Sequence, residues 1–103
     1  METVNILYIG RHLEILETVV RLLNATDNWN GVGAMNDEEA KEIFQKNDFS
    51  IVLLGCGIQK ESENDLCVFF KNKKPSIIIV QHYGGGSGLL QSEILVALER
   101  TIN

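Results

Sequence analysis

The chain has 103 residues, of which 45% are hydrophobic and 22% charged, and its formal net charge at pH 7 is −5. This length and composition predict a single soluble globular domain over residues 1–103. The acidic balance argues against a nucleic-acid partner, because phosphate backbones are bound by basic surfaces.

Other features of the sequence exclude further classes. The chain has no run of 18 apolar residues, which argues against a membrane partner. Its start lacks the basic-then-apolar pattern of a secretory signal. Its two cysteines, Cys56 and Cys67, match neither a disulfide framework nor the spacing of a zinc site. We therefore expect a cytoplasmic protein with reduced thiols and without a bound metal.

Strand and helix patterns alternate along the chain. Continuous apolar runs predict buried strands, and apolar residues at helical spacing predict helices. The strands are expected at Val4–Ile9, Gly31–Met35, Phe49–Leu54 and Ser76–Val80, and the helices at Leu13–Leu23, Asp37–Lys46, Glu63–Asn72 and Leu89–Thr101. This alternation implies a three-layer α/β fold of the flavodoxin type, with a parallel four-stranded sheet in the order 2-1-3-4.

Local signals add detail to this prediction. Asn36 can cap the helix that follows it, with Glu39 reaching back to it in a capping box. Leu13 is expected on the buried face of the first helix. Trp29 is expected inside a polar turn over residues 24–30, where it could anchor a partner or cover the bottom of the core, and the second role is slightly favoured.

The third predicted strand ends in Gly55, at the edge where doubly wound proteins place their chemistry. Glycine has no side chain, so the residue expected to carry a reaction is missing. Cys56 follows it, and a buried structural role for this thiol is favoured over a reactive one. No acid, base or nucleophile constellation is visible, and we expect neither an enzyme nor a cofactor.

Three stretches of the chain resemble the receiver domain of response regulators: Ile6–Glu17, Ala34–Ala40 and Asn47–Leu54. The resemblance covers roughly residues 4 to 80. It implies that the family's acidic metal-binding pair falls on Gly10 and Arg11, its phosphoacceptor on Gly55, and its Ser/Thr position on Val80 or Gln81. The family's lysine has no counterpart.

These replacements remove the family's mechanism. Magnesium needs carboxylate oxygens, which Gly10 lacks, and Arg11 would repel the cation. Phosphoryl transfer to the chain needs a carboxylate nucleophile, which Gly55 cannot supply. The resemblance therefore implies a degenerate, phosphorylation-incompetent pseudo-receiver that acts in signalling by binding protein.

The last strand and helix suggest a second copy of the chain as the partner. A receiver has a fifth strand, and this chain is expected to be truncated before it. The fourth strand would then be an apolar edge, which is a template for association. The predicted homodimer interface consists of Ile77, Ile78, Ile79, Leu90 and Ile94.

A different class of function stays open, namely a small-ligand or anion-binding module at the carboxyl edge of the sheet. Backbone amides at a helix start can bind an anion. The candidate residues lie between the fourth strand and the last helix, beside Gly10 and Gly55: His82, Gly84, Gly85, Gly86, Ser87 and Gly88. A flexible connection is the simpler interpretation of this stretch. His12, His82 and Cys56 could likewise form a metal or pH-sensitive site, against the simpler interpretation of histidines exposed in loops.

Overall fold

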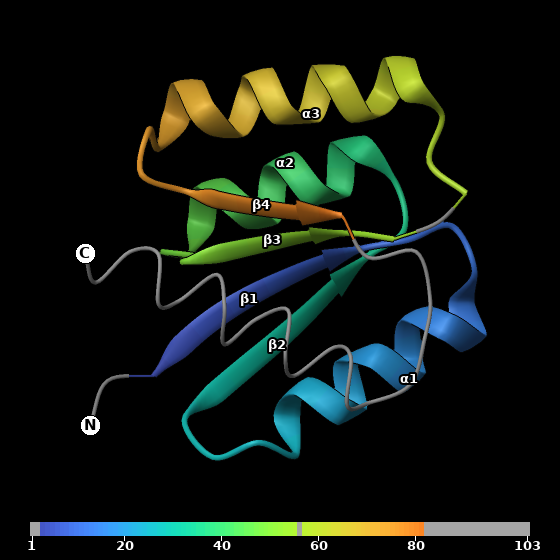
Figure 1. Ribbon diagram of the computed structural model, residues 1–103, viewed down its shortest axis with the longest axis vertical. Helices are drawn as coiled ribbons and strands as arrows, with labels where there is room; N and C mark the ends of the chain where they lie inside the picture. The colour runs from blue at the N-terminus through green and yellow to red at the C-terminus, as the bar shows by residue number, and fades with distance from the viewer. Residues whose placement is uncertain (1–2, 56, 82–103) are drawn as a thin grey trace.

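A computed structural model of the chain describes residues 3–55 and 57–81. In this part, strands and helices alternate: β1 (Val4–Ile9), α1 (Leu13–Asn24), β2 (Trp29–Ala34), α2 (Asp37–Lys46), β3 (Ile51–Leu54), α3 (Lys60–Lys73) and β4 (Ile78–Gln81). The strands form one parallel sheet in the order β2-β1-β3-β4 (Figure 1). The predicted fold class and strand order are confirmed. The predicted helix Leu89–Thr101 lies outside the described residues.

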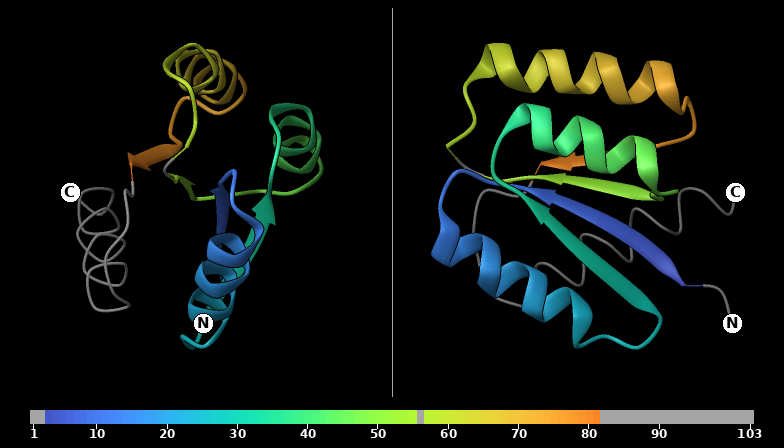
Figure 2. Two further views of the ribbon diagram at one scale, coloured as in Figure 1. Left: turned by 90° about the vertical axis from the view of Figure 1, so that its right-hand side faces the viewer. Right: turned by 180° about the vertical axis from the view of Figure 1, so that it is seen from behind.

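The sheet is covered on both faces. Figure 2 shows α1 on one face and α2 with α3 on the other. Successive side chains of a strand point to opposite faces, so β1 and β3 contribute to both cores. The α1-side core consists of Ile6, Tyr8, Leu16, Val19, Leu23, Ile51 and Leu53. The α2–α3-side core consists of Leu7, Ile9, Ala34, Ala40, Phe44, Phe49, Val52, Leu54, Leu66, Phe70 and Ile77.

Aromatic rings join α2, α3 and the segment that leads into β3. The ring centroids of Phe44 and Phe70 lie 4.5 Å apart, and those of Phe44 and Phe49 lie 6.0 Å apart. An ion pair of 2.7 Å between Lys41 Nζ and Asp65 Oδ2 links the two helices at the surface. These contacts hold α2 and α3 side by side.

The glycines of β2 allow α1 to lie close to the sheet. A Cβ added at Gly33 would lie 2.6 Å from Leu16 Cδ2, and one at Gly31 would lie 2.7 Å from Leu23 Cβ. Side chains at these positions would push the helix outward. Glycines usually weaken a strand, but here they let Leu16 and Leu23 pack into the core.

The start of β2 differs from the prediction. The strand begins at Trp29 rather than Gly31, and Trp29 pairs with Val4 of β1. The turn is short because Asn28 adopts a φ of 71° and the Trp29 amide donates to Thr26 O at 3.2 Å. Trp29 is therefore a strand residue, and it packs against the α1-side core as expected.

Four other expectations are corrected. α3 begins at Lys60 rather than Glu63, because the Glu63 amide already donates to Gln59 O at 2.9 Å. β3 begins at Ile51 and β4 at Ile78, each two residues later than predicted. Leu13 is 53% exposed, since it is the first residue of α1 and the buried stripe begins at Leu16.

Candidate functional site at the carboxyl edge

Gly10 and Gly55 lie together where β1 and β3 end. The Gly55 amide donates to Ile9 O at 2.8 Å, and the Gly10 amide donates to Ala34 O at 3.1 Å. These hydrogen bonds extend the parallel pairing beyond the strands on both sides of β1. Both glycines are buried. The two positions that the sequence singled out are therefore neighbours at one edge of the sheet.

The side chain of Tyr8 fills the space beside both glycines. A Cβ added at Gly10 would lie 2.8 Å from Tyr8 Cε2, and one at Gly55 would lie 2.7 Å from Tyr8 Cζ. Both distances are shorter than 3.0 Å, and a Cβ atom in a real protein essentially never lies that close to a non-bonded heavy atom. Tyr8 is 2% exposed and belongs to the α1-side core. Its ring therefore occupies the volume into which side chains at positions 10 and 55 would project.

The sequence did not predict a role for Tyr8 at this edge, because Tyr8 is one more residue of an apolar strand there. Its signal is an aromatic ring with a polar end in an otherwise aliphatic run, two residues before a glycine. That signal does not reveal the second glycine, because Gly55 is brought to Tyr8 only by the pairing of β1 with β3.

Arg11 is directed toward the start of α2. Its Nη1 donates to Met35 O at 2.9 Å, and its Nη2 contacts Asp37 Oδ1 at 2.6 Å. The Arg11 and Asp37 side chains are each 27% exposed. The guanidinium thus connects the end of β1 to the amino end of α2, and it pairs with a carboxylate at this edge.

His12 and Gly57 border the same edge. Gly57 has a φ of 87°, and a Cβ added to it would lie 3.3 Å from Arg11 Cβ and 3.8 Å from His12 Nε2. Only glycine adopts this backbone conformation without strain, so the turn after β3 passes close to the start of α1. Cys56, His82 and the residues Gly84, Gly85, Gly86, Ser87 and Gly88 lie outside the described residues. The anion-binding and metal-site hypotheses therefore stay predictions.

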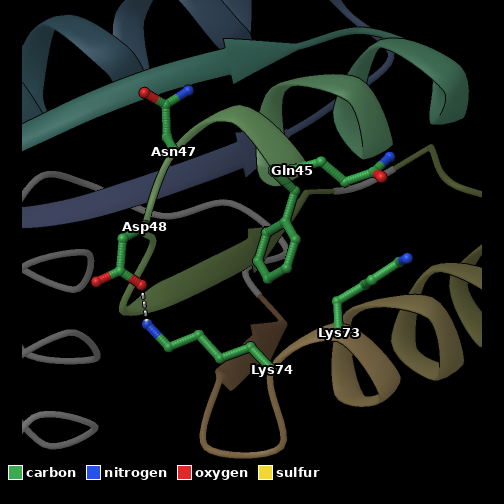
Figure 3. Close-up of a pocket in the computed structure, with 6 residues that line it drawn as sticks. Gln45, Asn47, Asp48, Lys73 and Lys74 are labelled. Carbon is green, nitrogen blue, oxygen red and sulfur yellow. Dashed lines mark hydrogen bonds and ion pairs between the residues drawn. The ribbon is translucent and has the colours of Figure 1, made fainter.

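A surface pocket opens at the opposite end of the sheet, between the last turns of α2 and α3. It is lined by Phe44, Gln45, Asn47, Asp48, Lys73 and Lys74, and Figure 3 labels each of these residues except Phe44. Lys74 Nζ contacts Asp48 Oδ1 and Phe49 O, both at 2.6 Å. Lys73 Nζ lies 5.7 Å from the centroid of the Phe69 ring. These lysines stabilise helix ends and a loop, and the pocket holds no acid–base pair besides Lys74 and Asp48.

Cys67 lies on α3 and is half-buried. Burial raises the pKa of its thiol, and the nearby charge of Glu63 raises that pKa further. A raised pKa lowers the thiolate fraction, which favours a packing role over a reactive one for this cysteine.

The predicted interface residues of the fourth strand have different environments. Ile77 is 1% exposed and belongs to the α2–α3-side core, whereas Ile78 and Ile79 are half-buried. Ile77 is therefore unable to contact a second chain while it stays packed in that core. Leu90 and Ile94 lie outside the described residues. Within residues 3–55 and 57–81, no helix has the length and apolar character needed to cross a membrane.

Comparisons place this architecture among known folds. No protein-family model and no curated protein matches the chain. A response regulator receiver domain protein from Clostridium thermocellum has a TM-score of 0.68 and 26% identity, over 93% of this chain and 75% of that one. A receiver protein from Pseudomonas putida has a TM-score of 0.69 and 16% identity, over 94% and 81%. The non-phosphorylated HemR receiver domain from Leptospira biflexa has a TM-score of 0.68 and 20% identity, over 98% and 95%. The chain has the receiver fold.

Proposed function

We propose that this receiver-fold chain is a pseudo-receiver, a signalling module that associates with protein and works without being phosphorylated. A receiver fold points to a role in signalling. The observation that carries the proposal is the Tyr8 ring beside Gly10 and Gly55, where the resemblance implies the metal-binding and phosphoacceptor carboxylates.

The proposal follows from the chemistry of the two glycines. Phosphoryl transfer to a side chain needs a nucleophile, and a side chain at position 55 would collide with Tyr8. A magnesium ion needs several oxygen ligands. Gly10 offers no side-chain oxygen, and Arg11 brings a positive charge that is already paired with Asp37.

Incubation with acetyl phosphate and magnesium, followed by intact mass spectrometry, tests the proposal. The mass is expected to stay unchanged, while a phosphorylation-competent receiver treated in parallel gains a phosphoryl group. A stoichiometric, base-labile adduct on this chain would overturn the proposal.

The proposed protein partner is a second copy of the chain, in a homodimer. Light scattering is expected to give a mass twice the 11.5 kDa of one chain. A mass of one chain at every concentration would exclude self-association while leaving the phosphorylation result untouched.

A further inference from the structure

We infer that the outward face of α3 is the contact between two copies of this chain. This inference rests on the proposed self-association and names its surface. It competes with the β4 edge that the sequence suggested.

An exposed stripe with an apolar centre runs along α3. Val68 is 61% exposed, more than Leu13 or Ile15, which are the other exposed large apolar side chains among the described residues. Leu66 and Phe70 of the same helix are fully buried, so Val68 has no part in the core. The exposed residues around it recur at helical spacing along one side of α3: Glu61, Asn64, Asp65, Lys71 and Asn72.

The two ends of this stripe carry opposite charge. Glu61 and Asp65 precede Val68, and Lys71 follows it. Charges at helix ends also complement the helix dipole, which accounts for Glu61 and Lys71. The dipole does not account for an outward valine midway between the two ends.

A two-fold axis through Val68 makes this stripe complementary to itself. Two antiparallel copies of α3 then place Asp65 opposite the partner's Lys71, and Asn64 opposite the partner's Asn72. Val68 meets the partner's Val68 at the axis. Because a two-fold contact repeats every pair, the dimer contains two attractive charge pairs.

The side chains are available for this contact. Asp65 uses Oδ2 for its ion pair with Lys41, and its side chain is still 61% exposed, so Oδ1 can accept from a second cation. Lys71 donates to Ile77 O at 2.8 Å. An ammonium has three donors, and no carboxylate in the described part of the chain pairs with this one.

Charge reversal tests the register. In a dimer of the Asp65→Lys variant, each of the two pairs would bring two lysines together. In a dimer of the Lys71→Glu variant, each pair would bring two carboxylates together. Each variant is therefore expected to lose about tenfold or more in association constant. An equimolar mixture of the two variants restores one lysine and one carboxylate in every pair. Sedimentation velocity at low salt is expected to show two weakened variants whose mixture regains the dimer.

Matched controls use the exposed pair Glu17 and Arg21 on α1, which has the same charges. Glu17→Lys and Arg21→Glu are expected to leave the dimer intact. Melting temperatures of all variants check that each chain is folded. Added salt is expected to weaken the wild-type dimer, because exposed charges are screened.

Two results would overturn the inference. If the wild-type chain dimerises and both α3 variants dimerise equally well, the contact lies elsewhere, for example at β4, and self-association itself survives. If both variants are monomeric and folded but their mixture stays monomeric, the antiparallel register about Val68 is wrong.

Discussion

Tyr8, Gly10 and Gly55 form one structural unit, in which the ring requires both glycines. The sequence predicts the position of Gly55 well, because a long apolar run ending in glycine marks the carboxyl end of a buried strand. It does not predict what fills the site. The neighbour of Gly55 is a ring from a strand more than 40 residues earlier, as the pairing of β1 with β3 shows.

The first prediction tests this unit with a double-mutant cycle. Gly55→Ala is expected to lower the free energy of unfolding by about 1–3 kcal/mol, because the added methyl group overpacks against Tyr8. In the Tyr8→Val background the same change should cost much less, since the ring is gone. Urea unfolding of the four chains measures the coupling.

A milder change provides the control for this cycle. Tyr8→Phe removes only the hydroxyl group, which is the atom nearest to an added Cβ at Gly55. The cost of Gly55→Ala should therefore be intermediate in that background. Equal costs in all three backgrounds would show that Tyr8 does not close the site.

The thiol of Cys67 gives a second prediction. Burial and the charge of Glu63 raise its pKa, so iodoacetamide should react more slowly with the folded chain at pH 8 than with the chain in urea. The Cys56→Ser variant isolates this thiol. Glu63→Gln removes one cause of the raised pKa and should speed the folded-state reaction.

The raised pKa also sets the sign of a stability effect. The folded chain holds the thiol proton more tightly than the unfolded chain does, so its contribution to stability is present below the thiol pKa of the unfolded chain. That contribution is lost as the pH rises from this value through the higher thiol pKa of the folded chain. Equal alkylation rates in the folded and unfolded chains would contradict both expectations.

At the scale of elements, the boundaries predicted best are those set by local chemistry. α2 begins where the sequence predicts, because Asn36 Oδ1 accepts from the Glu39 amide at 2.7 Å, and it ends at the predicted Lys46. Glu39 reaches back one residue further than expected, to the Met35 amide at 3.2 Å. The start of α3 has no such signal. Its N-cap Gln59 makes no side-chain hydrogen bond, and its first turns are polar.

The cap of α2 gives the third prediction. Asn36→Ala should lower the free energy of unfolding by about 1 kcal/mol, because it leaves the Glu39 amide without its acceptor. Asn36→Asp keeps an acceptor at the positive end of the helix dipole and should cost little. Gln59→Ala, at the uncapped start of α3, is the matched control and should be close to neutral. Thermal unfolding measures all three, and equal losses for Asn36→Ala and Gln59→Ala would contradict the prediction.

At the scale of the whole molecule, the sheet joins the two cores. Within β1, Ile6 and Tyr8 belong to the α1-side core, whereas Leu7 and Ile9 belong to the α2–α3-side core. The same alternation holds in β3. Because neither core can lose its packing without exposing the central strands, we expect the described part of the chain to unfold as one cooperative unit, in line with the single domain predicted from its length.

Native-state hydrogen exchange tests this cooperativity with a matched pair of substitutions. Leu23 belongs to the α1-side core and Leu66 to the α2–α3-side core, and both are 0% exposed. Each Leu→Ala change should destabilise the chain by about 2–5 kcal/mol. In a single unit, each should lower the protection of the β1 amides by its own full loss of stability. If Leu23→Ala instead weakened only α1 and β2 while the amides of β3 kept their wild-type protection, the two faces of the sheet would unfold separately, and the prediction of one domain would be wrong.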